Sequence, residues 1–427
     1  MMYLLFLLWF LLGCFWLFKS GPAKRLGLKS WVITLLFVCK VWAALFYGWF
    51  FRQMDDYAVK ADTWAMHYAA REETKWLLQE PMAFFTDVYT PRYADDGGLM
   101  ATENSLFNDL KQVIFIKLLA LVNLVTGQYY VVNVVVFSII CFMGLLHLVE
   151  FFTRYLGKAA LVASLGALFC FPTILFWTSG MHKDGLLLAI SGWLLWGWNN
   201  SRRQAWQWPL WIICMVIFFL LRVHVFILFF LCFFPISLKW PVYKIRPAFK
   251  LYTLVFLTLV SVILLWVYNP VVPASWLAAR RADFLLLTAS DVVSSTVFTP
   301  NFRGILSFLP QAAAYGFLWP LPGMYSSPFA MLAGVENAVI LLLAIAAVYV
   351  GRRRKYVHLH TAVLLACFLY VITNFLLIGY TIPYLSPLMR YKSIVLPFMV
   401  IPSLVIAMND RMNLLQLYIT NTPLVYT

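Results

Sequence analysis

The sequence contains few charged residues. Asp, Glu, Lys and Arg make up 11% of the 427 residues, whereas an ordinary soluble domain carries about a quarter. Hydrophobic residues account for 63% of the chain, and the mean hydropathy is +0.84. This composition excludes an ordinary soluble domain and predicts a polytopic membrane protein.

The sequence also lacks motifs for disulfides and for structural zinc. Its seven cysteines all fall inside apolar runs, and none forms a CxxC pair or a Cys/His pair at metal-ligand spacing. The net charge of +15 would suggest a nucleic-acid partner in a soluble protein. In a membrane protein it is the usual excess of Lys and Arg in cytoplasmic loops, so we expect no nucleic-acid partner.

Long apolar runs are abundant, and they predict an all-α fold of about 11 transmembrane helices (10 to 12). Several runs are shorter than the roughly 20 residues of an untilted span, so tilt or partial insertion is expected for them. The runs are 2–18, 31–51, 130–150, 159–177, 185–199, 208–221, 223–238, 251–268, 328–350, 360–379 and 393–409.

Basic residues predict which connections are cytoplasmic. Lys and Arg cluster in alternate connections between the runs, and the positive-inside rule assigns such connections to the cytoplasm. The remaining connections then lie on the periplasmic or extracellular side. The clusters are Lys19, Lys24, Arg25 and Lys29; Arg154 and Lys158; Arg202 and Arg203; Lys239, Lys244, Arg246 and Lys250; Arg352, Arg353, Arg354 and Lys355; and Arg411.

Two segments decide whether this alternation holds. Segment 113–126 is too short for an ordinary span and contains Lys117, so we expect a helix along the outer interface. Segment 208–238 is expected to form two short helices that meet on the outer side at Arg222 and His224. A single bent helix is the alternative.

The predicted topology divides the chain into five segments. These are 1–51, the first two transmembrane helices; 52–129, a large helical first external loop with juxtamembrane helices; 130–268, a transmembrane bundle; 269–327, a second long external loop; and 328–427, the C-terminal transmembrane helices with a short cytoplasmic tail.

Carboxylates are concentrated in the first external loop. Eleven of the 17 Asp and Glu residues lie within 52–112. The start of this loop has helical spacing that places Asp62, Met66 and Glu73 on one face. Asp55, Asp56 and Asp62 lie close to the end of a span, where desolvation raises a carboxylate pKa towards that of a useful base. The other acids of the loop are expected to be solvated.

Charged residues of two further groups lie on the predicted outer side. Lys183 and Asp184 stand alone in a turn between two apolar helices, either as a functional pair or as a pair in a wet loop; His182 beside them is expected to be a bystander. External arginines and lysines suit phosphate, with snorkelling or pairing with loop acids as the alternative. They are Arg222, Arg280, Arg281, Arg303, Arg390 and Lys392.

In their order along the chain, these motifs resemble those of the GT-C superfamily of polyprenyl-phosphate-sugar-dependent membrane glycosyltransferases. ADTWAMHYAA around Asp62 resembles the family's Asp-x-x-x-Tyr-His-type motif, although His67 here precedes the tyrosine. FPTILFWTSGMHKDG resembles a Pro-x-x-x-x-(Trp/Ser)-Ser-Gly-x-x-Lys-Glu turn, with Asp184 in place of Glu. LLRVHVF resembles an Arg-Pro-His turn, with Val223 in place of Pro, and YLSPLMRYKSIVLP resembles an Arg-Tyr-(Arg/Lys)-x-x-x-x-Pro motif.

The resemblance implies transfer of a sugar from a polyprenyl-phosphate donor to a lipid, glycan or protein acceptor. The site would face the periplasm or exterior of a bacterial inner (plasma) membrane, in synthesis of a cell-envelope polysaccharide. Asp62 would be the general base, with Asp55 and Asp56 as the other candidates. Whether a divalent cation is needed stays open; loop carboxylates or Asp184 would hold it. The residues expected to bind substrate are His67, Lys183, Asp184, Arg222, His224, Arg390, Tyr391 and Lys392.

Three other functions stay open at this point. A lipid-linked polysaccharide polymerase would depend on external arginines more than on Asp62. A transporter or flippase would require ionisable groups near the membrane midplane, where Lys40, Arg222 and Glu336 are the candidates. A non-enzymatic assembly protein would use the acidic loop as a docking surface.

Overall fold

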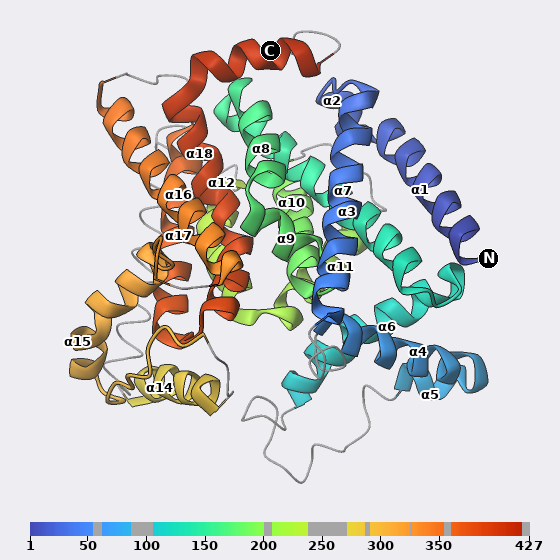
Figure 1. Ribbon diagram of the computed structural model, residues 1–427, viewed down its shortest axis with the longest axis horizontal. Coiled ribbons are helices and arrows are strands. Elements are labelled where there is room, and N and C mark those ends of the chain that lie inside the picture. The colour runs from blue at the N-terminus through green and yellow to red at the C-terminus, as the bar shows by residue number, and fades with distance from the viewer. Residues whose placement is uncertain are drawn as a thin grey trace. The chain divides into compact units, whose positions relative to one another are not determined.

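The structure is a computed structural model that describes residues 1–53, 62–86, 106–199, 207–237, 271–286, 291–324, 327–353 and 360–420 (Figure 1). The elements in these ranges are helices. Extended residues there pair only in two isolated bridges, Leu28 with Thr420 and Val292 with Tyr384. The predicted all-α class is therefore confirmed.

Six of the described helices are long and apolar enough to cross a membrane. They are α1 (Met2–Lys19), α3 (Ser30–Arg52), α7 (Tyr130–Leu156), α16 (Pro328–Arg353), α17 (Thr361–Thr381) and the Leu385–Met408 part of α18 (Leu385–Ile419). A seventh candidate is broken by a bend of 68° between α8 (Ala159–Cys170) and α9 (Pro172–Ser179). The chain is thus a multi-pass membrane protein.

The expected number of eleven spans is not confirmed. Three predicted spans form helices of only 15 to 17 residues, α10 (Lys183–Asn199), α11 (Gln207–Leu221) and α12 (Val223–Ser237), which is short for an untilted crossing. The predicted span 251–268 lies outside the described residues. The break at Arg222, which both the hairpin and the bent-helix alternatives require, is present.

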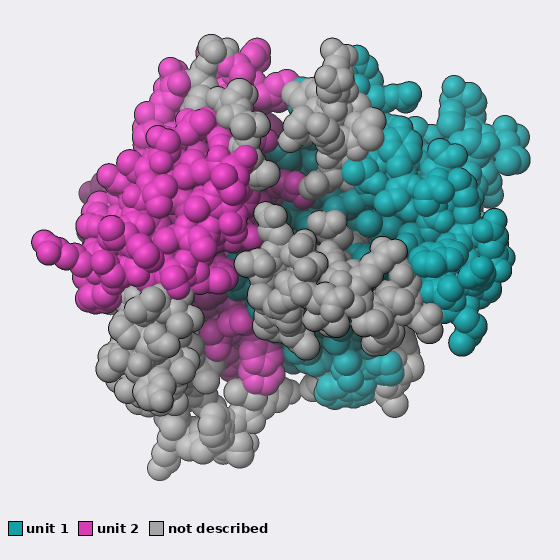
Figure 2. Space-filling model, turned by 90° about the horizontal axis from the view of Figure 1, so that it is seen from below, with its two compact units in different colours: residues 1–151, 175–226, 417–427 teal, residues 152–174, 227–416 magenta. Residues whose placement is uncertain are grey.

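The chain forms two compact units (Figure 2). Unit 1 contains residues 1–151, 175–226 and 417–427, and unit 2 contains residues 152–174 and 227–416. Because the units interleave along the chain, they do not follow the five predicted segments, which stay a prediction.

The two ends of α3 in unit 1 carry different elements. At its beginning, α2 (Gly21–Arg25) is joined to the C-terminal part of α7 by a bidentate ion pair between Arg25 and Glu150, with distances of 2.5 and 2.9 Å. At its other end, the indole nitrogen of Trp64 donates to the Gly48 carbonyl at 2.9 Å. The helix that contains Trp64, α4 (Asp62–Gln79), therefore lies at the opposite end of α3 from α2.

The helix predicted at the start of the 52–129 segment is confirmed as α4, which packs with α5 (Pro81–Thr86) and α6 (Leu106–Thr126) as one layer of unit 1 (Figure 1). On the predicted face, Met66 is buried and Glu73 is half-buried. The buried Lys117 ammonium of α6 binds the Glu73 carboxylate at 3.1 Å and the Phe84 carbonyl. The apolar part of α6, Val113–Thr126, is shorter than a span.

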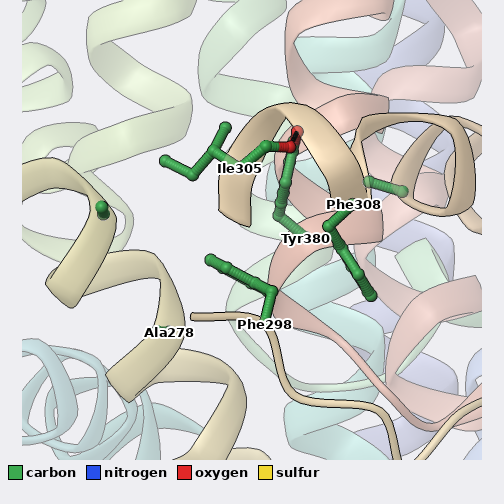
Figure 3. Close-up of a cluster of buried hydrophobic side chains, with 7 residues drawn as sticks. Ala278, Phe298, Ile305, Phe308 and Tyr380 are labelled. Carbon is green, nitrogen blue, oxygen red and sulfur yellow. Dashed lines mark hydrogen bonds between the residues drawn. The ribbon is translucent and has the colours of Figure 1, made fainter. Parts of the chain in front are cut away.

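Unit 2 carries two further helices, α14 (Val271–Leu286) and α15 (Phe302–Ala313), the latter continuing as a π-helical turn, η3 (Ala314–Leu318). Phe298, Ile305, Phe308 and Tyr380 form a buried apolar cluster between α15 and the last turn of α17 (Figure 3). The Tyr380 hydroxyl donates to the Ile305 carbonyl at 2.7 Å. Helices α14 and α15 thus pack at the C-terminal end of α17.

Candidate functional site

The turn between α9 and α10 is tight and depends on two glycines. A Cβ atom on Gly185 would lie 2.2 Å from the Thr178 carbonyl oxygen, and one on Gly180 would lie 2.6 Å from the Tyr47 ring. Such separations are far below van der Waals contact, so any larger residue would push the turn open. Glycine at these positions lets α10 begin directly against the end of α9.

Asp184 and Arg222 meet in the interior of unit 1. Asp184 lies in the first turn of α10, and its side chain is fully buried. Its Oδ1 atom accepts a hydrogen bond from Nη2 of Arg222 at 2.5 Å, and the Arg222 side chain is only 5% exposed. The two residues are 38 positions apart in the sequence. The structure therefore joins two motifs that lie far apart in the sequence.

His182 belongs to the same group. Its Nδ1 atom lies 3.2 Å both from the Asp184 backbone nitrogen and from Oδ2 of Asp184, and its ring centroid is 5.0 Å from that of Tyr47. The prediction that His182 is a bystander missed these contacts, because its only signal in the sequence is adjacency to Lys183 and Asp184. We call Asp184, Arg222 and His182 the acid–base cluster.

The cost of burial explains why this cluster is the candidate site. Removing two charges from water costs several kcal/mol per ion by order of magnitude, and only close pairing offsets the penalty. Ionisable groups inside membrane proteins are accordingly rare and mark functional sites by default. Lys183 and His224, next to the cluster in sequence, are half-buried.

The α4 part of the predicted site is only partly described. Asp62 is the first residue of α4, but its side chain lies outside the described residues, as do Asp55 and Asp56. The next turn is firmly held, because Thr63 shares a hydrogen bond with the Tyr130 hydroxyl at 2.8 Å and Trp64 stacks on Tyr130 at a centroid distance of 3.9 Å. The backbone at Asp62 is therefore anchored at the end of α3.

His67 is buried at one end of a polar network. Its Nδ1 atom lies 3.4 Å from Nδ2 of Asn133, whose amide group also donates to Asn123 at 2.7 Å, and Asn123 donates to Thr74 at 3.0 Å. Burial, with a smaller contribution from the positive charge of Arg71, lowers the pKa of His67 to about 4. His67 is therefore neutral at physiological pH. With Nδ1 accepting from Asn133, the proton of the neutral ring is on Nε2.

The predicted residues Arg390, Tyr391 and Lys392 lie in α18 and belong to unit 2. Lys392 is fully buried; its ammonium donates to the Trp319 carbonyl at 2.9 Å and to Oδ1 of Asn337 at 3.2 Å. Arg390 and Tyr391 are half-buried, and the Tyr391 ring lies 6.3 Å from that of Phe284 in α14. Lys392 is thus bound by protein groups beside the end of η3.

Arg281, another of the predicted external cations, is also bound by protein groups. Its guanidinium is fully buried and donates to four backbone carbonyls, those of Thr296 at 2.6 Å, Ser294 at 3.1 Å, and Gly379 and Tyr380 at 3.4 Å each. Burial lowers the pKa of Arg281. The neighbouring Arg280 is half-exposed and lies 3.7 Å from Asp283. Arg281 therefore ties the 294–296 segment to the C-terminal turn of α17.

Comparisons with known proteins add no relative. No family model, curated protein or solved structure matches the chain. Within the described residues, no group of three or more His, Cys, Asp or Glu side chains is arranged to hold a metal ion.

Proposed function

We propose that the protein is an integral membrane glycosyltransferase, which moves a sugar from a polyprenyl-phosphate carrier to an acceptor on the non-cytoplasmic face of a bacterial inner membrane. The observation that carries the proposal is the buried acid–base cluster. Its Asp184 and Arg222 come from two of the motifs that resemble the GT-C superfamily, and they are in direct contact. An ion pair kept at this cost in an apolar protein supports a role in chemistry.

Arg222 and Asp184 would have different roles in the transfer. The guanidinium of Arg222 would bind the phosphate that leaves with the polyprenyl chain, where negative charge develops during transfer. Asp184 would hold the guanidinium in one orientation, since a carboxylate and a guanidinium bind each other directionally. Half-buried Lys183 would add a second positive charge.

Asp62 would be the general base. It would take the proton of the acceptor hydroxyl or amine as that group bonds to the anomeric carbon and the bond from that carbon to the phosphate oxygen breaks. The bonding electrons leave with the phosphate, and one displacement inverts the anomeric centre. His67, one turn further along α4, would bind substrate as a neutral hydrogen-bond donor through Nε2–H.

Transfer of label tests this proposal directly. The purified protein in lipid vesicles is incubated with radiolabelled polyprenyl-phosphate sugars and an envelope-lipid extract as acceptor. Asp62→Asn should reduce transfer by about 10² to 10⁴-fold, the usual contribution of a general base. Glu72→Gln is the matched control, because Glu72 is exposed on the same helix and forms an ion pair with Lys75 at 2.8 Å.

Two results would argue against this assignment. No transfer by folded wild-type protein from any donor would contradict the enzyme proposal. Full activity of Asp62→Asn together with loss in Arg222→Ala would favour the polysaccharide polymerase.

A transporter or flippase is the second candidate, because one predicted span is broken. The two ends of α9 bind buried charges: the Glu336 carboxylate accepts from the Thr173 backbone nitrogen at 2.8 Å, and the Lys40 ammonium donates to the Thr178 carbonyl at 3.0 Å. Broken helices with ion-binding ends are typical of transporter sites. Substrate uptake that is abolished by Glu336→Gln, without any label transfer by wild type, would favour this candidate.

A further inference from the structure

Helix α15 of unit 2 has an inner face that packs on the protein. The Phe308 ring lies beside Tyr380 of α17, and the Ile305 carbonyl meets the Tyr380 hydroxyl (Figure 3). Gly304, Ile305 and Ala312 are buried on the same side of the helix. Asn301 caps the helix by accepting a hydrogen bond from the Gly304 backbone nitrogen at 2.7 Å. This face fixes the orientation of α15 about its own axis.

A second face of α15 is apolar but exposed. Phe302 and Leu306 are each 51% exposed, and Leu309 is 38% exposed. Their spacing of four and three residues places them in one stripe along the helix. We call these three residues the outer stripe of α15. Exposed apolar area of this kind is unfavourable in contact with water.

The third face of α15 is polar. Arg303, Ser307 and Gln311 are exposed and repeat every four residues, so they form a row of their own. At 100° per residue, the polar row, the inner face and the outer stripe point in three different directions around the helix axis. The helix thus has a protein side, an apolar side and a water side. This division is typical of helices that lie in the plane of a membrane surface.

The position of α15 relative to the spans of unit 2 agrees with a location at the membrane surface. Its Ile305 carbonyl accepts the hydroxyl of Tyr380, in the last turn of α17. Following η3, the chain enters the span α16 at Pro328, the end opposite Arg352 and Arg353. The exposed apolar side chains of α16, such as Leu342 at 66% and Ile345 at 65%, form the lipid-facing surface of the same unit. Helix α15 therefore lies where a span begins and another ends.

We propose that the outer stripe of α15 is buried among the acyl chains of the leaflet at this end of the spans, with Arg303 beside the lipid phosphates. The occupant is lipid because α15 packs beside the last turn of the span α17 and leads through η3 towards the first residue of the span α16, so it lies at the end of two spans. The Asn301 cap and the Tyr380 hydrogen bond would hold α15 in its orientation. The helix would then fix the depth of the 291–324 segment relative to the membrane. This inference is independent of the enzyme proposal.

Collision rates of spin labels test the inference. The cysteines that are not buried, Cys14, Cys39 and Cys170, are first replaced by alanine. Labelling of this variant measures the background signal from the buried cysteines. Leu306→Cys and Ser307→Cys are then labelled separately with a nitroxide in vesicles of phosphatidylethanolamine and phosphatidylglycerol. The label at 306 should collide severalfold more often with oxygen, which concentrates in lipid, than the label at 307. For a water-soluble nickel chelate the order should reverse.

Two other outcomes would overturn the inference. Frequent collision of the 306 label with the nickel chelate would mean that the stripe faces water. Slow collision with both reagents would mean that protein covers it, either a second copy of the chain or another subunit. Leu309→Cys repeats the measurement one turn further along, so local misfolding at position 306 cannot decide the result.

Discussion

Arg222 of unit 1 is buried in a different way from Arg281 and Lys392 of unit 2. In unit 1, Arg222 binds the carboxylate of Asp184, whereas in unit 2 Arg281 and Lys392 bind backbone carbonyls at the ends of α17 and η3. Carbonyls at the last turn of a helix lack partners within the helix and carry partial negative charge. A buried cation at a helix end therefore has a structural explanation. A buried cation that is paired with a buried acid has no structural explanation as simple as this. It is therefore the better candidate for a catalytic role.

The largest effect on stability is expected from breaking the pair in unit 1. Arg222→Met takes the guanidinium away from the fully buried Asp184 carboxylate, so we expect the free energy of unfolding to fall by about 3 to 5 kcal/mol. The double variant Arg222→Met/Asp184→Leu should recover most of this loss, since no charge is left buried. Denaturant unfolding in detergent micelles measures both. A double variant no more stable than the single variant would contradict the assigned contact.

Adjacent arginines in unit 2 give the next test. Arg281→Met removes a donor from four carbonyls, and one unsatisfied buried group already costs about 1 to 3 kcal/mol. Arg280→Met is the matched control, because Arg280 is half-exposed and a surface substitution changes stability by about 0.5 kcal/mol or less. Both are compared with wild type by the same unfolding measurement. Equal stability of the two variants would show that Arg281 does not tie the 294–296 segment to α17.

Gly185→Ala tests the turn that presents Asp184. The added methyl group would meet the Thr178 carbonyl at 2.2 Å, and overpacking of this kind costs about 1 to 3 kcal/mol. Gly166→Ala in α8 is the control, since a Cβ there meets nothing within 4 Å, and alanine is favoured over glycine in a helix by about 0.5 to 1 kcal/mol. If Gly185→Ala were as stable as Gly166→Ala, the turn would be looser than described.

His67 should give the smallest effect, a dependence of stability on pH. Its pKa is lowered from 6.5 to about 4 in the folded protein, so acid protonates the unfolded chain first. The free energy of unfolding should fall as the pH decreases from about 6.5 to about 4. Above about pH 6.5, His67 should contribute no further dependence of stability on pH. His67→Gln should remove that part of the pH dependence. An unchanged pH profile in the variant would contradict a neutral, buried His67.

The periodic features of the fold could be predicted from the sequence, since an apolar run needs no information beyond itself. Each predicted run outside the undescribed 238–270 segment coincides with helix, and the helix predicted at the start of the 52–129 segment is confirmed as α4. The number of spans could not be fixed in this way. Whether a helix of 15 residues crosses, tilts or stops depends on the helices around it.

The site was predictable in its members but not in its pairings. Asp184 and Arg222 stood out because each is a charge in apolar sequence. Their contact joins residues 38 positions apart, and no local pattern encodes it. Arg281 and Lys392 were expected to bind phosphate because they are positive charges on the predicted outer side. Both instead donate to backbone carbonyls of distant elements, and such acceptors leave no trace in residue identity. His182 was undervalued for the same reason, since its contacts with Asp184 and Tyr47 arise only in the folded turn.

The specific transfer activity of Arg222→Lys, set against that of Arg281→Lys, tests the contrast between the two units most directly. Each substitution keeps the positive charge and removes the planar fork that binds phosphate or carboxylate in two places. With both variants normalised to folded protein, Arg222→Lys should lose about 10² to 10³-fold in transfer from a polyprenyl-phosphate sugar, as for the loss of one oxyanion donor. Arg281→Lys should stay close to wild type. Equal activities in the two variants would contradict the account.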